Sequence, residues 1–374
     1  MSLLIFGFLA PVKSLSVLDP DIQWNLIDVG VEEAWSYTQG NPNIVVAVID
    51  SGIDNSHPDL VNQTWKNQGE IPDNGLDDDG NGYIDDIIGW DFRDNDNDPS
   101  PGHSHGTFVA GLIAADDDND IIVGIAPNIR LMALRFLDDQ NQFGGNDWDM
   151  FIEAIEYAVN NGANIIHLSI SAYEIPPKSF HTAIKSAYNS GVIVVSVTGN
   201  NQDEVTYPGK YPEVIAVSAT TKDRKIAFFS SAGDQNEICA PGENISSIFP
   251  GISTTRIGSG TSFAAPLVSG AISLILSLNK SLSIEMVRSI LHETSTDLGD
   301  QGKDPIFGYG LLNVSAALEK VVNEHNNGSI PCISSETDIL SSMTSTSSVN
   351  KAGLSFISSF GILTLIFLFG KKKR

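Results

Sequence analysis

The sequence predicts an α/β protein with three layers, in which a mostly parallel, twisted sheet carries helices on both faces. Short β-branched segments alternate with helical stretches along the chain, as they do in βαβ units. The strand segments are also almost continuously apolar, which is typical of strands covered on both faces. The segments that we expect to be buried strands are residues 44–50, 129–136, 163–170, 192–198 and 214–220.

Helical stretches fill the intervals between these strands. One begins at His105 and runs to residue 115, and two more are expected over residues 147–162 and 180–191. The last two end with glycine, which is the usual residue just after a helix. A long apolar helix follows Gly260, and Pro266 fits into it because it lies in the first turn.

Composition and charge narrow the class of protein. Apolar residues make up 41% of the 374 residues, and the 33 glycines outnumber the 21 lysines and arginines. These values favour a compact, loop-rich enzyme over a coiled coil or a disordered chain. The formal net charge of −25 argues against nucleic acid as a partner, because an acidic surface repels phosphate. Cys239 and Cys332 form no disulfide framework, and we expect them not to pair.

Both ends of the sequence carry apolar segments outside the expected globular domain, residues 21–322. Residues 1–16 resemble a secretory signal, although the usual positive charge before the apolar run is missing. A truncated start and an uncleaved anchor are the alternatives that this leaves open.

The C-terminal segments predict a membrane anchor. Residues 323–351 are rich in Ser, Thr and Asn, as in an exposed stalk. Residues 352–370 carry no charge and are long enough to cross a bilayer, and the basic residues 371–374 should stay on the cytoplasmic side. We therefore expect a single-pass protein of the cell membrane with its globular domain outside. The alternative is a cleaved sorting signal whose tail is exchanged for a lipid.

Three segments carry the residues best suited to catalysis. Asp50 ends an expected buried strand, at the edge where ligands of open α/β sheets gather. His105 opens a helix within HGTFVAG, and Ser262 lies at a helix N-terminus within GSGTSFAAP, where backbone N–H groups stabilise developing negative charge. Each residue alone is explained as a cap or a structural residue. Together, in this order and at intervals of 55 and 157 residues, they are hard to obtain by chance.

These segments resemble the subtilisin-like serine proteases (subtilases), whose triad has the same chain order. The resemblance runs from about Gln23 to Leu318, and it implies a subtilisin-like fold and serine endopeptidase activity on protein or peptide substrates. It also implies that Ser262 is the nucleophile, that His105 is the general base and that Asp50 orients the imidazole. Further motifs agree with the family pattern, namely GIAP (124–127), TGN (198–200), YPGKYPEVIAVSA (207–219), FSSAG (229–233), APG (240–242) and GYGLLN (308–313).

The resemblance further implies an oxyanion hole and a substrate-binding strand. Asn200, in TGN, matches the asparagine that binds the oxyanion together with the backbone N–H of Ser262. The segment Leu168, Ser169, Ile170, Ser171 and Ala172 matches the family's SLGG strand, which lines the cleft and the primary specificity pocket.

The chain departs from the family pattern at several positions. Phe108 and Phe263 stand where histidine and methionine are usual, and neither position belongs to the triad. Ser171 and Ala172 replace two glycines, so we expect a narrower or reshaped specificity pocket. The triad is complete, and this argues against the alternative of a catalytically silent binding module with the same fold.

An acidic loop predicts a calcium site. Asp77, Asp79, Asn81 and Asp85 fall at positions 1, 3, 5 and 9 of a pattern like the first part of an EF-hand, with Gly82 at position 6. Position 12 is Ile88, so a true EF-hand is excluded and another acid must complete the shell. A plain solvated loop is the alternative. The candidate calcium ligands here are Asp77, Asp79, Asn81, Tyr83, Asp85 and Asp86.

The family also implies a second calcium site, to which Gln23, Asp59 and Asp118 would contribute. Zinc is not expected, because no Cys/His cluster has ligand spacing. Family members usually carry a folded propeptide before the catalytic domain, whereas only a few residues precede it here. Either that segment is missing from this sequence, or the chain folds unaided with the help of calcium. We expect the chain to act as a monomer.

Overall fold

The structure is a computed structural model that describes residues 18–117 and 122–327. The signal-like segment 1–16, most of the predicted stalk, the predicted membrane span 352–370, the basic tail 371–374 and Cys332 lie outside these residues. Within them, the last helix continues to Asn326, four residues beyond the predicted domain boundary at 322. The first residues of the predicted stalk are therefore helical.

A parallel sheet forms the middle layer and confirms the predicted fold class. Its strand order is β2-β3-β1-β4-β5-β6-β7, and every neighbouring pair is parallel. β8 and β9 form a separate antiparallel hairpin. The strands are β1 (Val45–Asp50), β2 (Gly89–Asp91), β3 (Arg130–Arg135), β4 (Ile165–Leu168), β5 (Ile193–Val197), β6 (Val214–Thr220), β7 (Asn236–Pro241), β8 (Ile245–Phe249) and β9 (Ile252–Gly258).

Alternate side chains of the central strand enter two different cores. Val46 and Val48 of β1 belong to one apolar cluster, whereas Ala47 and Ile49 belong to the other. This follows from the period of two in a strand, and it explains why the strand segments are apolar throughout. Every residue of β1 is buried, including its last residue, Asp50.

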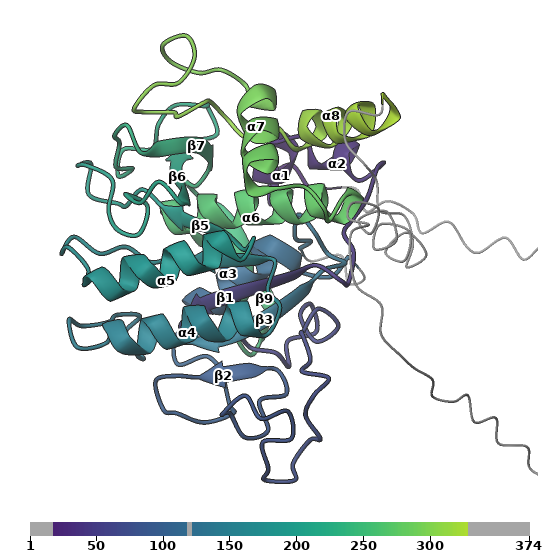
Figure 1. The fold of residues 1–374 in the computed structure, drawn as a ribbon. Coiled ribbons are helices and arrows are strands. Elements are labelled where there is room, and N and C mark those ends of the chain that lie inside the picture. The colour runs from purple at the N-terminus through teal and green to yellow at the C-terminus, as the bar shows by residue number, and fades with distance from the viewer. Residues whose placement is uncertain (1–17, 118–121, 328–374) are drawn as a thin grey trace, which may run out of the picture. The chain divides into compact units, whose positions relative to one another are not determined.

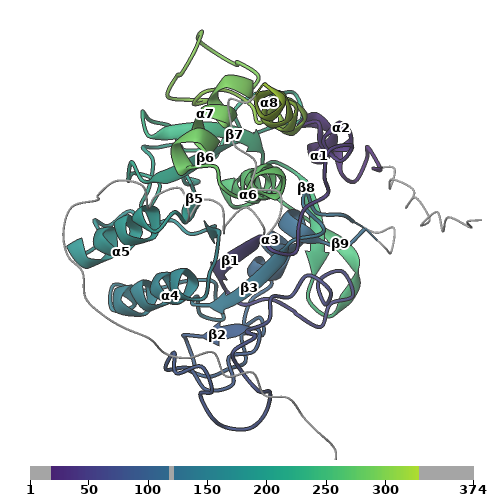
Figure 2. The same cartoon turned by 45° about the vertical axis from the view of Figure 1, so that its right-hand side comes forward.

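Helices cover both faces of the sheet (Figures 1 and 2). α4 and α5 lie on one face, and α3 and α6 lie on the other, with the remaining helices packed beyond α6. The helices are α1 (Trp24–Asp28), α2 (Val31–Ala34), α3 (His105–Ala114), α4 (Trp148–Asn160), α5 (Lys178–Asn189), α6 (Thr261–Leu278), α7 (Ile284–Thr294) and α8 (Val314–Asn326).

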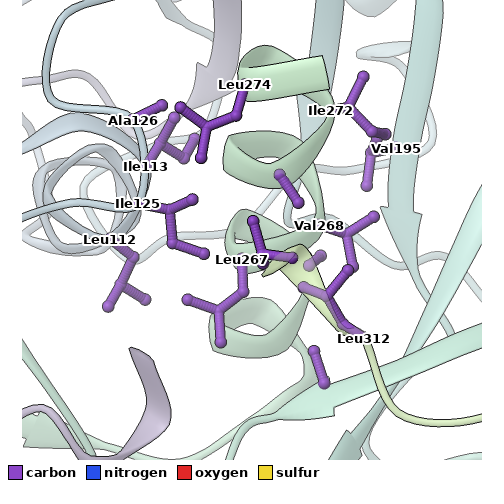
Figure 3. Close-up of a cluster of buried hydrophobic side chains, with 14 of the residues drawn as sticks. Leu112, Ile113, Ile125, Ala126, Val195, Leu267, Val268, Ile272, Leu274 and Leu312 are labelled. Atoms are coloured by element: carbon purple, nitrogen blue, oxygen red, sulfur yellow. The ribbon is translucent and has the colours of Figure 1, made fainter. Parts of the chain in front are cut away.

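α6 is the central helix of the larger core. Figure 3 shows its side chains Leu267, Val268, Ile272 and Leu274 among residues of α3, β5 and the loop after α3. Among the described residues, α6 alone is long and apolar enough to cross a membrane, but 78% of it is buried within the protein. Its apolar sequence is therefore explained by its place in the core.

Candidate active site

The candidate residues gather where the strand order reverses. The chain runs from β1 outward to β2 and β3 on one side, and then crosses to β4 on the other side. Such a switch point leaves a crevice at the carboxyl ends of the strands, and ligands bind there in open α/β sheets. Asp50 ends β1, the segment after Leu168 leaves β4, and Asn200 follows β5 by three residues.

Asp50 and His105 form a buried pair. The imidazole Nδ1–H of His105 donates to Asp50, with Nδ1 2.8 Å from Oδ1 and 3.0 Å from Oδ2. The backbone N–H of Ser51 also donates to Oδ1, at 2.7 Å. Because the carboxylate holds Nδ1–H, the lone pair of the neutral ring is on Nε2. The Asp50 carboxylate is 0% exposed, and 12% of the His105 side chain remains exposed.

The electrostatics of this pair stabilise the charged form of each partner. Burial alone would lower the pKa of His105, but the charge and the hydrogen bond of Asp50 outweigh it and raise that pKa above 6.5. Burial alone would also raise the pKa of Asp50, but His105 and the Ser51 N–H hold that pKa below its ordinary value. An imidazolium at position 105 is therefore stabilised relative to the same group in water.

A glycine lets α3 approach β1 closely enough for this pair to form. A Cβ at Gly106 would lie 2.3 Å from the carbonyl oxygen of Gly52 and 3.2 Å from the Asp50 side chain. No side chain fits into that space, so the small residue after His105 has a steric cause. The motif HG at positions 105–106 thus encodes a close contact between helix and strand.

Ser262 lies in the first turn of α6, beside the pair. Its hydroxyl donates to the carbonyl oxygen of Ser169, at 3.4 Å. The neighbouring ring of Phe263 contacts both His105 and Phe108, with ring centroids 5.7 and 4.4 Å away. Among the described residues, no hydrogen bond joins Ser262 to His105; such bonds are often loose in the absence of substrate. The ring contact also shows that Phe108 and Phe263, the two departures from the family pattern, pack against each other.

The side-chain amide of Asn200 has a fixed orientation. Its Oδ1 accepts hydrogen bonds from the backbone N–H and the hydroxyl of Thr261, at 2.8 and 2.9 Å. These two donors assign the oxygen end of the amide to the N-terminus of α6. The two N–H donors on Nδ2 are then available to a ligand, next to Thr261, the residue before Ser262.

The segment 168–172 leaves the sheet and joins a second element. Leu168 and Ile170 are buried in the core on the α4 and α5 side, so only their main chain can face a cleft. Ala172 exchanges backbone hydrogen bonds with Tyr207, at 2.8 and 2.9 Å. Ser171 and Ala172 are half-buried. Side chains are therefore present where the family pattern has glycines.

Part of the acidic loop gathers into a cluster of carboxylates. Ligand oxygens of Glu70, Asp77 and Asp79 lie within 4.8 Å of one another. Gly69 permits this approach, since a Cβ there would come within 2.6 Å of the Asp79 Cβ. Hard oxygen donors at this spacing fit calcium or magnesium and do not fit zinc.

The other candidate ligands of this loop have different partners. The Asp85 carboxylate accepts the backbone N–H groups of Asn74 and Gly75, at 3.1 and 2.8 Å. Asp86 is buried and accepts hydrogen bonds from Asn67, Asn81 and Tyr157. Burial raises the pKa of Asp86 despite these bonds.

Tyr83 places its ring in an aromatic group with Trp90, Phe92 and Tyr157. Asn81 reaches both Asp79 and Asp86 through its side-chain amide. Of the predicted set, Asp77 and Asp79 are therefore the residues that the structure brings together with Glu70.

The second predicted calcium site is only partly described. Gln23 is buried and spans the loop after α3, donating to the Val123 carbonyl at 2.7 Å and accepting its N–H at 3.3 Å. Asp59 is buried, and its carbonyl accepts the N–H of Asp116, at 2.9 Å. Asp118 lies outside the described residues. Gln23 and Asp59 thus both contact the segments that flank residues 118–121.

Two buried polar residues near these sites have no signal in the sequence. Glu70 accepts the backbone N–H groups of Asp78, Asp79 and Asp85, but it lies outside the EF-hand spacing. His167 lies in β4, where a histidine within an apolar run gives no sign of its partners. Only the three-dimensional contacts identify them.

Comparison with known proteins agrees with this geometry. Residues 41–310 match the model of the subtilase family. Subtilisin DY of Bacillus licheniformis is 36% identical over 282 residues, which cover 74% of this chain and 91% of that protein. Subtilisin E of Bacillus subtilis (strain 168) is 36% identical over 283 residues, covering 74% of this chain and 66% of that protein.

A longer relative matches over a smaller share of its own length. The minor extracellular protease Epr of Bacillus subtilis (strain 168) is 33% identical over 296 residues, covering 79% of this chain and 41% of that protein. The family model covers the part of the chain that holds the parallel sheet and the Asp50–His105 pair. The chain therefore belongs to the subtilase family, whose members are serine endopeptidases.

Proposed function

We propose that the chain is an extracytoplasmic, membrane-anchored serine endopeptidase in which Asp50, His105 and Ser262 form the catalytic triad. The pair of His105 and Asp50 is the observation that carries the catalytic part of this proposal. Nδ1 lies 2.8 Å from Oδ1, and the ring of His105 contacts Phe263 in the first turn of α6. Such a pair turns the Nε2 lone pair of His105 toward the position of the nucleophile.

In the proposed reaction, the Ser262 oxygen attacks the peptide carbonyl carbon while His105 Nε2 takes the hydroxyl proton. The oxyanion that forms receives hydrogen bonds from Asn200 Nδ2 and the backbone N–H of Ser262. His105 then gives its proton to the leaving amine, and an acyl-enzyme remains. A water molecule then attacks the acyl-enzyme through the same proton transfers and releases the carboxylic acid product. Asp50 stays ionised throughout and stabilises the imidazolium.

The substrate main chain would lie along the segment Ser169 to Ala172. Its main chain would pair with an extended peptide, as strands pair at a sheet edge. Side chains at Ser171 and Ala172 reduce the room for the substrate residue before the cleaved bond. We therefore expect a preference for smaller side chains there than a pocket with two glycines would accept.

A fluorophosphonate probe tests this proposal against the catalytically silent binding module. The probe reacts only with an activated serine, so the folded wild-type chain should take up one label per molecule, on the peptide that contains Ser262. Labelling should accompany cleavage of an unfolded protein substrate. A folded chain that takes up no label in the presence of calcium would favour the binding module.

Calcium is the proposed structural ion of the acidic loop, with Glu70, Asp77 and Asp79 as its core ligands. Three carboxylates within 4.8 Å repel one another, and a divalent cation removes this repulsion. The ion would tie the loop before β2 into a fixed shape. We propose Gln23 and Asp59 for a second site that includes Asp118, and a monomer as the working unit.

Chelation of calcium is expected to destabilise the fold. At a calcium concentration about 100-fold above Kd, binding adds about 2.7 kcal/mol to the free energy of unfolding. Asp77→Asn should lose most of this gain. Asp73→Asn, an exposed acid in the same loop, should keep it. Urea unfolding with calcium or chelator, in a Ser262→Ala background that prevents self-cleavage, measures the difference. Equal midpoints with and without calcium would contradict the site.

The membrane anchor is proposed from residues 352–370 and the basic tail 371–374. Deleting residues 352–374 should move the protease from the membrane fraction into the medium. Mass spectrometry of the mature C-terminus distinguishes a retained span from a cleaved sorting signal. An intact peptide ending in Arg374 excludes cleavage.

A further inference from the structure

A line of buried polar side chains joins β4 to α6 behind the candidate cleft. His167, in β4, is 0% exposed. Its Nδ1 lies 2.8 Å from Ser269 Oγ, and its Nε2 lies 2.8 Å from Ser169 Oγ. The hydroxyl of Ser169 donates in turn to the carbonyl oxygen of Ser262, at 2.8 Å. Three hydrogen bonds thus lead from the middle of α6 to the main chain of Ser262.

The spacing of these residues follows from the two elements that carry them. His167 and Ser169 are two residues apart, so they lie on the same side of an extended chain. Ser262 and Ser269 are seven residues apart, which is about two helical turns on one face. β4 and α6 therefore meet at two polar points, with the nucleophile candidate at one of them.

The carbonyl of Ser262 depends on this contact because of Pro266. In an α-helix, the carbonyl of residue 262 accepts the N–H of residue 266. Residue 266 is proline and has no N–H, so the helix supplies no such donor. A buried carbonyl without a donor costs free energy. The Ser169 hydroxyl supplies the missing hydrogen bond to the residue that bears the reactive oxygen.

The positions of the protons in this line follow from the chemistry of each group. A carbonyl oxygen has no hydrogen, so the Ser169 proton must lie toward Ser262. Ser169 Oγ can then only accept from His167, and this assigns the proton of the ring to Nε2. His167 Nδ1 must therefore accept from the Ser269 hydroxyl. A ring with its proton on Nδ1 would instead draw the Ser169 proton away from the Ser262 carbonyl.

The surroundings keep the ring neutral. The pKa of His167 is lowered to about 3, mainly by burial; Asp50 offsets part of this effect, and His105 adds to it. A neutral ring has one donor and one acceptor, so the Ser262 carbonyl, which can only accept, fixes the direction of the whole line.

We infer that His167 is a positioning residue for Ser262. By accepting from Ser269 and donating to Ser169, it commits the Ser169 hydroxyl to the Ser262 carbonyl and fixes the peptide plane that follows the nucleophile. The return contact, from the Ser262 hydroxyl to the Ser169 carbonyl, places both residues in one reciprocal pair. This inference rests on the proposed role of Ser262 as the nucleophile.

Paired substitutions at position 167 test the inference. His167→Leu keeps the approximate volume of the side chain but removes both of its polar atoms. In His167→Gln, the side-chain amide nitrogen takes the position that Nε2 has in histidine. We expect His167→Leu to lower kcat about 10- to 100-fold with KM changed by less than about twofold, because a misplaced nucleophile slows acylation without weakening substrate binding. His167→Gln should recover most of that loss. Single-turnover acylation by an activated ester measures both the loss and its recovery.

Controls separate positioning from a general loss of packing. Ile272→Val removes one buried methyl group from α6, one turn beyond Ser269, and should leave kcat unchanged while lowering the melting temperature. If His167→Leu does not fold, Ser269→Ala takes its place. That variant removes only the donor to Nδ1 and should lower kcat several-fold. Unchanged kcat in either variant, or a Gln variant as impaired as the Leu variant, would overturn the inference.

A spectroscopic readout does not depend on activity. Nitrogen-15 NMR of the histidine rings should show His167 as the neutral Nε2–H tautomer, unchanged between pH 8 and pH 5. A proton on Nδ1, or titration within this range, would contradict the arrangement. A wild-type chain that neither labels nor cleaves would end the proposed function and this inference together. An active wild type with unaffected variants at 167 and 269 would end the inference alone.

Discussion

Replacing Ser262 by alanine is expected to lower the kcat of peptide hydrolysis by about 10⁶-fold, the scale set by loss of the nucleophile in a subtilisin. The substitution removes the oxygen that is proposed to form the acyl-enzyme, while Asn200 and the backbone N–H groups remain. Residual hydrolysis about 10³-fold above the uncatalysed rate should therefore persist. The measurement is peptide turnover with a fluorogenic substrate, together with the loss of fluorophosphonate labelling.

Ser289→Ala is the matched control for this change. It removes the same hydroxyl from the surface of α7, where the group donates a hydrogen bond to Glu293. Its turnover should equal that of the wild type. The prediction fails if Ser262→Ala retains more than about a hundredth of wild-type turnover, because a nucleophile elsewhere would then carry the reaction.

Replacing Asp50 by asparagine is expected to lower kcat by about 10⁴-fold and to shift the pH profile. The side-chain amide introduced at position 50 would donate to Nδ1 of His105, so the ring proton would lie on Nε2. A protonated Nε2 cannot accept the hydroxyl proton of Ser262. The negative charge that raises the pKa of His105 would also be lost. Both effects act through a hydrogen bond that the wild type makes at 2.8 Å.

The direction of the pH effect follows from the form of His105 that acts as a base. Protonated His105 cannot accept the serine proton, so kcat/KM falls as the pH drops through the pKa of His105. In the wild type this midpoint should lie above 6.5, because Asp50 raises that pKa. In Asp50→Asn it should move to lower pH. Asp54→Asn, which neutralises a nearby surface acid, should leave the midpoint in place; identical midpoints for the wild type and Asp50→Asn would refute the assignment.

The strands that the sequence predicts are those whose side chains enter a core on each face. The segments 44–50 and 214–220 differ from the observed β1 and β6 by at most one residue. β7 was not predicted, because Asn236, Glu237 and Pro241 interrupt its apolar pattern. Glu237 is buried there with Arg288 and His292 of α7. Ion pairs formed across distant segments have no local pattern, so such a strand is found only in the fold.

The residues of the site also fall into two groups: those that the sequence predicts and those that only the fold identifies. Asp50, His105 and Ser262 are predicted because each lies in a motif of small residues that can be read from the sequence, such as HG at positions 105–106. Glu70 and His167 are not predicted, because each depends on a partner outside its own motif: Asp78 is 8 residues from Glu70, and Ser269 is 102 residues from His167. Asp85 has the spacing of a ligand, and in the fold its carboxylate accepts the N–H groups of Asn74 and Gly75.

The place of α6 in the core bears on when activity arises during synthesis. The first strand of the sheet carries Asp50, whereas the helix that carries Ser262 follows all seven strands in the chain. That helix also covers one face of the sheet, so a nascent chain that ends before Thr261 has neither Ser262 nor a closed core. Folding and the capacity to cleave proteins are thus coupled to the same late segment. A ribosome that releases an incomplete chain releases no stray protease.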